Sequence, residues 1–315
     1  YFNVGINKVA RAIDGISFNL EEGKTLAIVG ESGCGKTQTA FSIIRLIANN
    51  GFHPSGEIYF NKRKLSNLTE LEMQSIRGND ISMIFQEPMT SLNPLYRIGN
   101  QLEEPLYQHR KIAKDPARKL AIELLNQVGI PDPHKRLDCF PHELSGGMKQ
   151  RVMIAMALAC KPKLLIADEP TTALDTTIQA QVLKLMSDLQ KETGMSILLI
   201  THDMGIVNQI ADDICIMYAG RIAEKGSRDN ILKNMAHPYT RHLMNSIPKV
   251  KDTGFILNTL PGMVSEATDY GTGCLFTERC SQAMDICKKI DSPQYTIEPN
   301  HFTFCHLYEH GKLPQ

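Results

Sequence analysis

Short apolar runs alternate with segments of helical periodicity through the middle of the chain. The runs TLAIV (25–29), KLLIAD (163–168) and SILLI (196–200) have the length and composition of buried strands. Apolar residues recur at helical spacing in three segments: Ala40, Ile43, Ile44 and Ile47; Ala121, Leu124, Leu125 and Val128; and Ile178, Val182, Leu185 and Leu189. This alternation of strands and helices predicts an α/β layered sheet.

The pattern changes towards the C-terminus. Residues 214–226 (ICIMYAGRIAEKG) predict a β-hairpin that turns at Ala219-Gly220. Beyond about residue 250 the periodicity is weak, and Pro, Gly and Cys become more frequent. We therefore expect a main body over 1–250 and a small appendage over 251–315.

Composition and charge exclude several classes of protein. Lys plus Arg (34) equals Asp plus Glu (34) in the 315 residues, so no overall basic charge attracts nucleic acid or an anionic membrane. The longest apolar runs, such as LLIA and ILLI, are far shorter than the roughly 20 residues of a membrane span. The first residues contain neither an initiator Met nor a signal-peptide pattern. We expect the natural chain to begin upstream and to work in the cytosol, where structural disulfides are unusual.

A phosphate-binding loop follows the first predicted strand. Residues 30–37 (GESGCGKT) match the pattern G-x-x-x-x-G-K-[ST] between a strand and a helix. Glycines let successive backbone N–H groups turn towards phosphate oxygens, and the helix N-terminus adds partial positive charge. The pattern predicts that the backbone of Ser32, Gly33, Cys34 and Gly35 cradles the phosphates, that Lys36 contacts the β- and γ-phosphates, and that Thr37 ligates Mg²⁺.

Two acidic residues end a second predicted strand. Asp168 and Glu169 follow LLIA, at the carboxyl end where open α/β sheets bind ligands. Asp168 suits a direct or water-mediated Mg²⁺ contact, and Glu169 is placed to polarise water for attack on the γ-phosphate. Such a strand end is commonly a solvated surface, but behind a phosphate loop it indicates hydrolysis.

The motif that identifies a family lies between these two. LSGGMKQR (144–151) closely resembles the signature of ATP-binding cassette (ABC) ATPases, in which Ser145, Gly146 and Gly147 would open a helix. In that family, this surface caps the γ-phosphate of ATP held by the other subunit of a dimer. The resemblance covers about residues 1–250. It implies an ABC (P-loop NTPase) core with an antiparallel β subdomain, a helical subdomain at about 87–160, and a small irregular Cys-containing C-terminal domain.

The same resemblance assigns further residues. Gln86 in IFQEP is similar to the glutamine that senses Mg²⁺, Asp175 in TALD to the D-loop aspartate, and His202 in ITHD to the switch histidine at the γ-phosphate. Each alone has an ordinary alternative: a surface amide, a helix N-cap or a strand-end histidine. Phe2, with Tyr1 as the alternative, is the candidate for stacking on adenine.

The resemblance extends to one branch of the transporters. MIFQEPMTSLNPLYRIGNQLEEPL (83–106) and HPYTRHLMNSIP (237–248) look like the oligopeptide/dipeptide importer branch. This implies an ATPase that powers peptide uptake at the cytoplasmic face of the inner or plasma membrane. Its implied partners are a second ABC ATPase subunit, two transmembrane permeases and, indirectly, an extracytoplasmic binding protein. Import of nickel or another small solute, a nucleic-acid-directed ABC ATPase and an inactive regulatory module are the alternatives.

The last of the eight cysteines form a separate question. Cys274, Cys280, Cys287 and Cys305 are spaced C-x5-C-x6-C-x17-C, unlike the closely spaced pairs of structural zinc. Four thiolates favour an iron–sulfur cluster or zinc, with His301 and His306 as alternative zinc ligands. Importer ATPases with this pattern resemble proteins that hold a 4Fe–4S cluster there, which makes these four cysteines the implied ligands. Unmetallated thiols remain an alternative.

Overall fold

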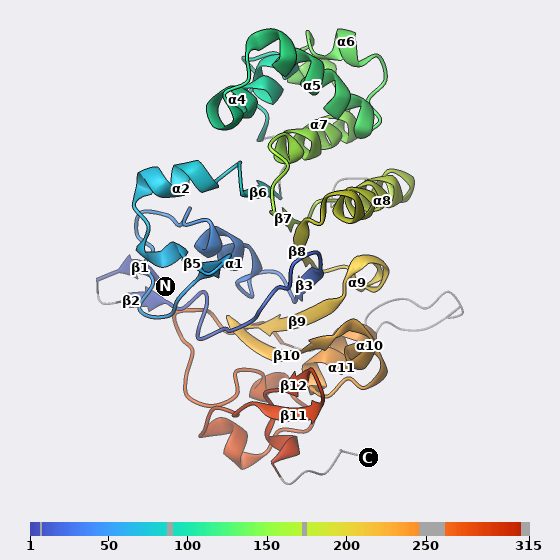
Figure 1. Cartoon of the computed structure of the whole chain (residues 1–315). Helices are drawn as coiled ribbons and strands as arrows, with labels where there is room; N and C mark the ends of the chain where they lie inside the picture. The colour runs from blue at the N-terminus through green and yellow to red at the C-terminus, as the bar shows by residue number, and fades with distance from the viewer. Residues whose placement is uncertain (7, 87–90, 172–174, 246–261, 310–315) are drawn as a thin grey trace. The chain divides into compact units, whose positions relative to one another are not determined.

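The computed structural model describes residues 1–6, 8–86, 91–171, 175–245 and 262–309 (Figure 1). The contacts divide the chain into two compact units. The first unit comprises Tyr1–Asn19, Leu26–Ile58 and Thr201–Gln315, and the second comprises Leu20–Thr25 and Tyr59–Ile200. The boundary predicted near residue 250 lies outside the described residues.

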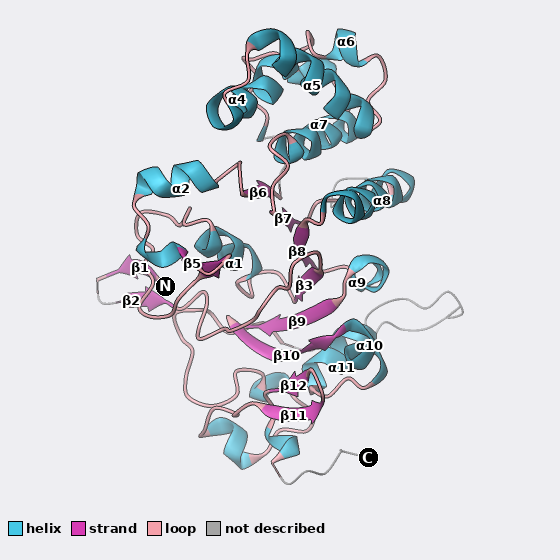
Figure 2. Cartoon of the chain, viewed as in Figure 1, coloured by secondary structure: helices cyan, strands magenta, loops and turns pink. Residues whose placement is uncertain are grey.

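The first unit is built on strands in the order β11-β12-β10-β9-β3 (Figure 2). Their bounds are Tyr295–Glu298, His301–Thr303, Arg221–Ser227, Asp213–Tyr218 and Thr25–Val29, of which Thr25 belongs to the second unit. Strand β3 is parallel to β9, whereas the other neighbours are antiparallel. The predicted hairpin is confirmed as β9–β10, and it turns through Ala219 (φ 46°) and Gly220 (φ 76°).

Shorter elements complete the first unit. Strands β1 (Phe2–Gly5) and β2 (Lys8–Ala10) form an antiparallel pair. The helices are α1 (Lys36–Ile43), α9 (Met204–Ile210), α10 (Arg228–Lys233) and α11 (Pro238–Asn245). Three 3₁₀ turns follow near the C-terminus, η3 (Thr277–Arg279), η4 (Asp285–Lys288) and η5 (His306–Tyr308).

The second unit contains the parallel strands β6 (Ile81–Ile84), β7 (Leu164–Asp168) and β8 (Ser196–Thr201, whose last residue belongs to the first unit) in the order β8-β7-β6. Every residue of β7 and β8 is buried, as expected of runs without polar alternation. A short antiparallel pair, β4 (Tyr59–Phe60) and β5 (Arg63–Lys64), precedes α2 (Glu70–Ile76). Helix α8 (Thr176–Thr193) links β7 to β8.

Within the second unit, a group of helices without intervening strands lies between β6 and β7 in the chain (Figure 1). It consists of α4 (Ile98–Arg110), α5 (Lys114–Gln127), α6 (Pro133–Arg136) and α7 (Gly146–Leu158). Leu106, Ala117 and Ala159 form a buried cluster there, against which Leu124 and other apolar side chains pack. The apolar periodicity predicted around residues 121–128 therefore marks a real packing face.

Two helical predictions needed correction. Helix α1 ends at Ile43, and Arg45 has a φ of 53°, so Ile47 lies beyond the helix. In α8 the most buried side chains are Val182, Leu183 and Met186. Of the predicted face only Val182 is fully buried. The apolar stripe of this helix is broad, and tertiary packing buries residues on one side of the predicted face.

The predicted α/β class is confirmed by these parallel strands and their connecting helices. Among the described residues, no helix combines the length and the apolar content that crossing a bilayer requires.

Candidate functional site

The loop 30–37 leads from β3 into α1, as the motif predicts, and two of its three glycines occupy places that no side chain could fill. A Cβ on Gly30 would lie 2.2 Å from the carbonyl oxygen of Met217. Gly35 has a φ of 101°, and a Cβ there would lie 2.4 Å from the carbonyl oxygen of Ala12. Both contacts are far below van der Waals separation, so the tight course of the loop depends on glycine at these positions.

Lys36 is the buried cation of this loop, with only 6% of the residue exposed. Its ammonium Nζ donates to the carbonyl oxygens of Gly30 (2.7 Å) and Glu31 (2.9 Å). The amine is thus held against the backbone of the loop's first two residues rather than extended into solvent. Thr37 follows in the first turn of α1 and is half-buried.

The other loop residues differ in exposure. Ser32 and Gly33 are exposed, and Gly33 has a φ of 80°. Cys34 is completely buried, and burial raises the pKa of its thiol. Its side chain therefore serves as packing, and only its backbone is available to a phosphate.

In the second unit, β7 delivers the two predicted carboxylates. Asp168 is the last residue of the strand and is only 1% exposed. Glu169 follows with a φ of 47°, a left-handed conformation uncommon for a non-glycine residue and often found at functional sites. Its N–H donates to the carbonyl oxygen of Ile200 in β8 (2.8 Å), and its Oε2 accepts from Gln86 Nε2 (3.2 Å). The structure therefore joins the expected catalytic carboxylate to the glutamine that the family resemblance assigns to sensing Mg²⁺.

The signature motif begins a helix, as predicted. Ser145 is the N-cap of α7, and its Oγ accepts from the N–H of Met148 at 3.4 Å. Gly146 and Gly147 form the first turn, where free N–H groups and the helix dipole favour an anion. Nothing lies within 4 Å of the position of a Cβ on Gly146, so the motif has an open approach.

Three more predicted site residues have clear places. Asp175 is the N-cap of α8 and accepts from the N–H of Ile178 at 2.9 Å. His202 is exposed directly after β8. Phe2 lies in β1, and its ring lies against Gly51. The alternative, Tyr1, donates its hydroxyl to Asp14 Oδ1 (2.6 Å).

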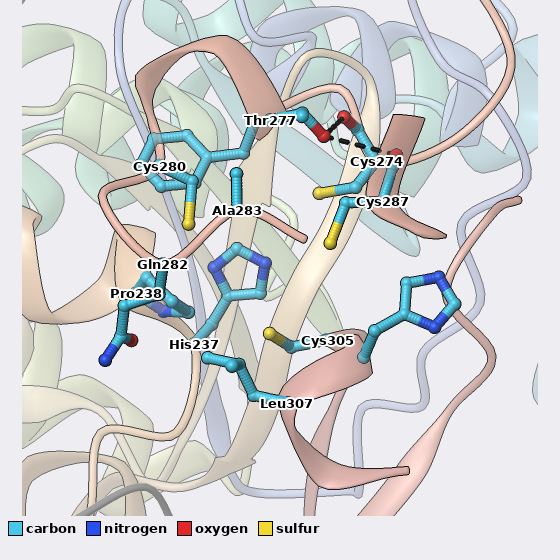
Figure 3. A pocket seen from close by; sticks show the side chains of 12 residues that line it. His237, Pro238, Cys274, Thr277, Cys280, Gln282, Ala283, Cys287, Cys305 and Leu307 are labelled. Carbon is cyan, nitrogen blue, oxygen red and sulfur yellow. Dashed lines mark hydrogen bonds between the residues drawn. The ribbon is translucent and has the colours of Figure 1, made fainter. Parts of the chain in front are cut away.

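The four C-terminal cysteines line one pocket of the first unit (Figure 3). Their sulfur atoms face a common space, although Cys274 precedes η3, Cys280 follows it, Cys287 lies in η4 and Cys305 precedes η5, up to 31 positions apart in sequence (274 to 305). Burial raises the pKa of the thiols of Cys274 and Cys280, and raises that of Cys305 to about 12. Among the described residues, no three or more His, Cys, Asp or Glu side chains are grouped closely enough to bind one metal ion directly. All eight cysteines are free thiols.

The two histidines considered as zinc ligands differ in position. His306 lines the same pocket, and its Nε2 lies 2.9 Å from the carbonyl oxygen of Ile290. His301 is fully buried, with its Nε2 2.7 Å from Glu224 Oε1, and is not among the residues that line the pocket.

Comparison with known proteins agrees with this geometry. Residues 13–172 match the family model described as ABC transporter, and residues 223–287 match the one described as oligopeptide/dipeptide transporter, C-terminal region. The oligopeptide transport ATP-binding protein OppD of Bacillus subtilis is 51% identical over 294 residues, which cover 93% of this chain and 82% of that protein. The chain belongs to the ABC transporter family.

Two further comparisons support the assignment of the chain to this family. The dipeptide transport ATP-binding protein DppD of Bacillus subtilis is 47% identical over 300 residues, covering 95% of this chain and 90% of that protein. A dimeric structure of the ATP-binding cassette MJ0796 bound to ADP and Pi has a TM-score of 0.62 at 30% identity, and covers 69% of this chain and 90% of that one.

The sequence analysis missed the residues that connect the C-terminal region to the phosphate loop. Arg279 and Tyr239 both contact Glu31, the second residue of the loop. Tyr239 belongs to HPYTRH, which was noted only as a branch marker. No sequence signal marks Arg279, because its partner Glu31 lies 248 positions away.

Proposed function

We propose that this ABC ATPase powers the import of di- and oligopeptides through membrane-embedded permeases. The observation that carries the proposal is the match of residues 223–287 to the C-terminal region of oligopeptide/dipeptide transporters, together with 47–51% identity to two proteins named for oligopeptide and dipeptide transport. Import of nickel or another small solute is the runner-up, because the ATPase subunit itself does not contact the cargo. The neutral charge balance weighs against a nucleic-acid-directed ATPase.

In this proposal the loop 30–37 binds the phosphates of ATP. Its backbone N–H groups and Lys36 would neutralise the charge of the phosphates, and Thr37 would ligate Mg²⁺. The close approach of Met217 to Gly30 and of Ala12 to Gly35 supports this, because such packing keeps the loop in one shape before the anion binds.

The carboxylates and their neighbours would carry hydrolysis. Asp168 and Gln86 would hold Mg²⁺, and Glu169 would accept a proton from the water that attacks the γ-phosphorus as the bond to the leaving ADP breaks. The hydrogen bond from Gln86 to Glu169 supports a shared role. His202 would contact the γ-phosphate, and Phe2 would stack on adenine.

A second ABC ATPase subunit is required by the proposal. Ser145, Gly146 and Gly147 would cap the γ-phosphate of ATP held by that subunit, with Asp175 at the dimer contact. The open N-terminus of α7 supports this assignment. ATP would close the dimer, and hydrolysis would release it.

The permease partners would be received by the region after Gln86. Leu95 (80% exposed) and Tyr96 (56% exposed) present apolar surface there. The neighbouring groove on α4 and the start of α5 is lined by Asn100, Glu103, Glu104, Tyr107, Gln108 and Lys114. The ATPase would therefore work as a peripheral subunit at the cytoplasmic face of the membrane, and contact the external binding protein only indirectly.

The four-cysteine pocket would hold a 4Fe–4S cluster through Cys274, Cys280, Cys287 and Cys305. The support is chemical: all four thiols line one pocket, and thiolate sulfur is the preferred ligand of iron–sulfur clusters. Such a cluster would tie down a region with little regular secondary structure. Iron and visible absorbance that are present in the purified complex, lost in Cys280→Ser and kept in Cys139→Ser would support it. Zinc alone, or no metal, would reject the cluster.

The catalytic assignment is tested by ATP hydrolysis in the assembled complex. We expect Glu169→Gln to lower kcat at least about 100-fold, as removal of a general base does, while ATP binding is retained. Glu192→Gln, an exposed change of the same kind on α8, should leave hydrolysis unaltered. Equal turnover in wild type and Glu169→Gln would remove Glu169 from the mechanism.

A further inference from the structure

An ion pair joins the phosphate loop to the C-terminal region: Arg279 pairs with Glu31, the second residue of the loop. Arg279 Nη1 lies 2.8 Å from Glu31 Oε2, and Arg279 Nη2 lies 3.1 Å from Glu31 Oε1. The arginine side chain is only 7% exposed, and the glutamate side chain is 28% exposed. A two-pronged arginine–carboxylate pair fixes orientation as well as distance, and this one is largely shielded from solvent.

The backbone of the same glutamate is held separately. The N–H of Glu31 donates to the hydroxyl of Tyr239 at 2.9 Å, and Tyr239 is completely buried at the start of α11. The carbonyl oxygen of Glu31 accepts from Lys36 Nζ. The orientation of the Glu31 residue therefore influences where the phosphate-binding ammonium sits, and residues 239 and 279 set that orientation.

The element that carries Arg279 also forms the wall of the four-cysteine pocket. Arg279 ends η3 and directly precedes Cys280, while Phe276 and Thr277 of the same turn line the pocket. The ring of Phe276 is 1% exposed and packs against Tyr218 (5.1 Å between centroids) and Tyr239 (5.4 Å). Because this interior is close-packed, a shift of the pocket wall would also move Arg279 and the ring beside Tyr239.

We propose that Arg279 is a positioning residue for ATP, and that it couples the four-cysteine pocket to the phosphate loop. Arg279 acts through Glu31 and does not touch the nucleotide. What the pocket holds then sets the affinity for ATP, and by thermodynamic reciprocity ATP changes the accessibility of the pocket thiols. The inference rests on the proposed role of loop 30–37 in binding ATP.

The first test is a double-mutant cycle on the assembled complex. Glu31→Gln and Arg279→Gln should each raise the Kd for ATP roughly fivefold or more, and the double variant should be no worse than the weaker-binding single variant. In steady-state hydrolysis the KM should rise while kcat changes little, because positioning of the phosphate loop affects binding. Asp229→Asn is the matched control: it breaks an exposed 3.1 Å ion pair with Arg228 on α10, which contacts neither Glu31 nor Arg279.

The second test measures the reverse direction by the rate at which maleimide labels Cys280, read by peptide mass spectrometry, after a chelator has removed any metal from the pocket. ATP should change the labelling rate in wild type and in Asp229→Asn, but not in Arg279→Gln. If Arg279→Gln does not assemble, both measurements are made with Glu31→Gln and Arg279→Lys instead. The lysine keeps the positive charge but cannot make the two parallel hydrogen bonds of the guanidinium group. The labelling response should be lost in Glu31→Gln and reduced in Arg279→Lys.

The outcomes distinguish a failure of ATP binding by loop 30–37 from a failure of the positioning role of Arg279. A wild-type complex that binds no ATP overturns the proposed role of the loop. A wild-type complex that binds ATP, with both single variants within twofold of it or with strictly additive effects, overturns the positioning role alone. Labelling of Cys280 that is indifferent to ATP overturns the coupling to the pocket.

Discussion

Glu224 is a fully buried carboxylate that organises the C-terminal region, and its replacement should be severely destabilising. It lies in β10, and its two oxygens accept from the backbone N–H groups of Ala236 and His237, each at 2.8 Å. The Nε2 of His301 in β12 lies 2.7 Å from the same carboxylate. One side chain thus ties β10 to β12 and to the segment that leads into α11.

The magnitude follows from these three contacts. Glu224→Ala would leave three buried polar groups without an acceptor, at roughly 1–3 kcal/mol each, so we expect a loss of about 3–6 kcal/mol in the free energy of unfolding after partial relaxation. Glu224→Gln keeps one oxygen but turns an NH₂ group towards a donor, and should cost about 1–3 kcal/mol. Because Tyr239 follows this segment, ATP affinity should fall as well.

Urea unfolding of the purified chain measures these changes. The matched control is Glu298→Gln, the same substitution at an exposed position in β11, where the side chain accepts from Asn234 Nδ2 at 3.3 Å. This variant should stay within about 0.5 kcal/mol of wild type. If Glu224→Gln were no more destabilising than Glu298→Gln, the organising role of this carboxylate would be refuted.

Two further predictions concern pH and helix capping. Burial lowers the pKa of His237 to about 4, and its Nδ1 accepts from the N–H of Tyr239 at 3.0 Å. The unfolded chain therefore binds more protons between pH 6.5 and 4, so this contribution to stability is present above pH 6.5 and lost on acidification, by about 2 kcal/mol at pH 5. Urea unfolding at pH 7.5 and pH 5 should show a smaller difference for His237→Asn than for wild type; equal differences would contradict the assignment. Ser145→Ala should lower stability by about 1 kcal/mol through loss of the α7 cap, and should also lower ATP hydrolysis. Thr69→Ala, which removes the cap of α2, should give a similar loss of stability with normal hydrolysis; equal hydrolysis in both variants would argue against the signature role of Ser145.

Local sequence signals predicted the parts of the fold that local physics determines. The buried strands β3, β7 and β8 are short apolar runs, and Ala219-Gly220 has the positive φ angles of a hairpin turn. The N-cap role considered for Asp175 is also confirmed, because an aspartate side chain can accept from the N–H three residues on.

The contacts that sequence reasoning missed depend on partners far along the chain. Strands β11 and β12 are short, and they exist by pairing with each other and with β10, a register that no local pattern encodes. The ion pair between Arg279 and Glu31 joins residues 248 positions apart. In the sequence, each of the two looks like an ordinary surface charge. The end of α1 at Ile43 likewise depends on the left-handed Arg45, a residue type that gives no stop signal.

Peptide uptake into proteoliposomes that contain the whole complex tests the central claim most directly. The account predicts uptake of a labelled di- or oligopeptide that requires ATP on the side of this subunit, that is competed by unlabelled peptide but not by nickel, and that is lost in Glu169→Gln. ATP-driven uptake of nickel without peptide uptake, or peptide uptake that persists unchanged in Glu169→Gln, would contradict it.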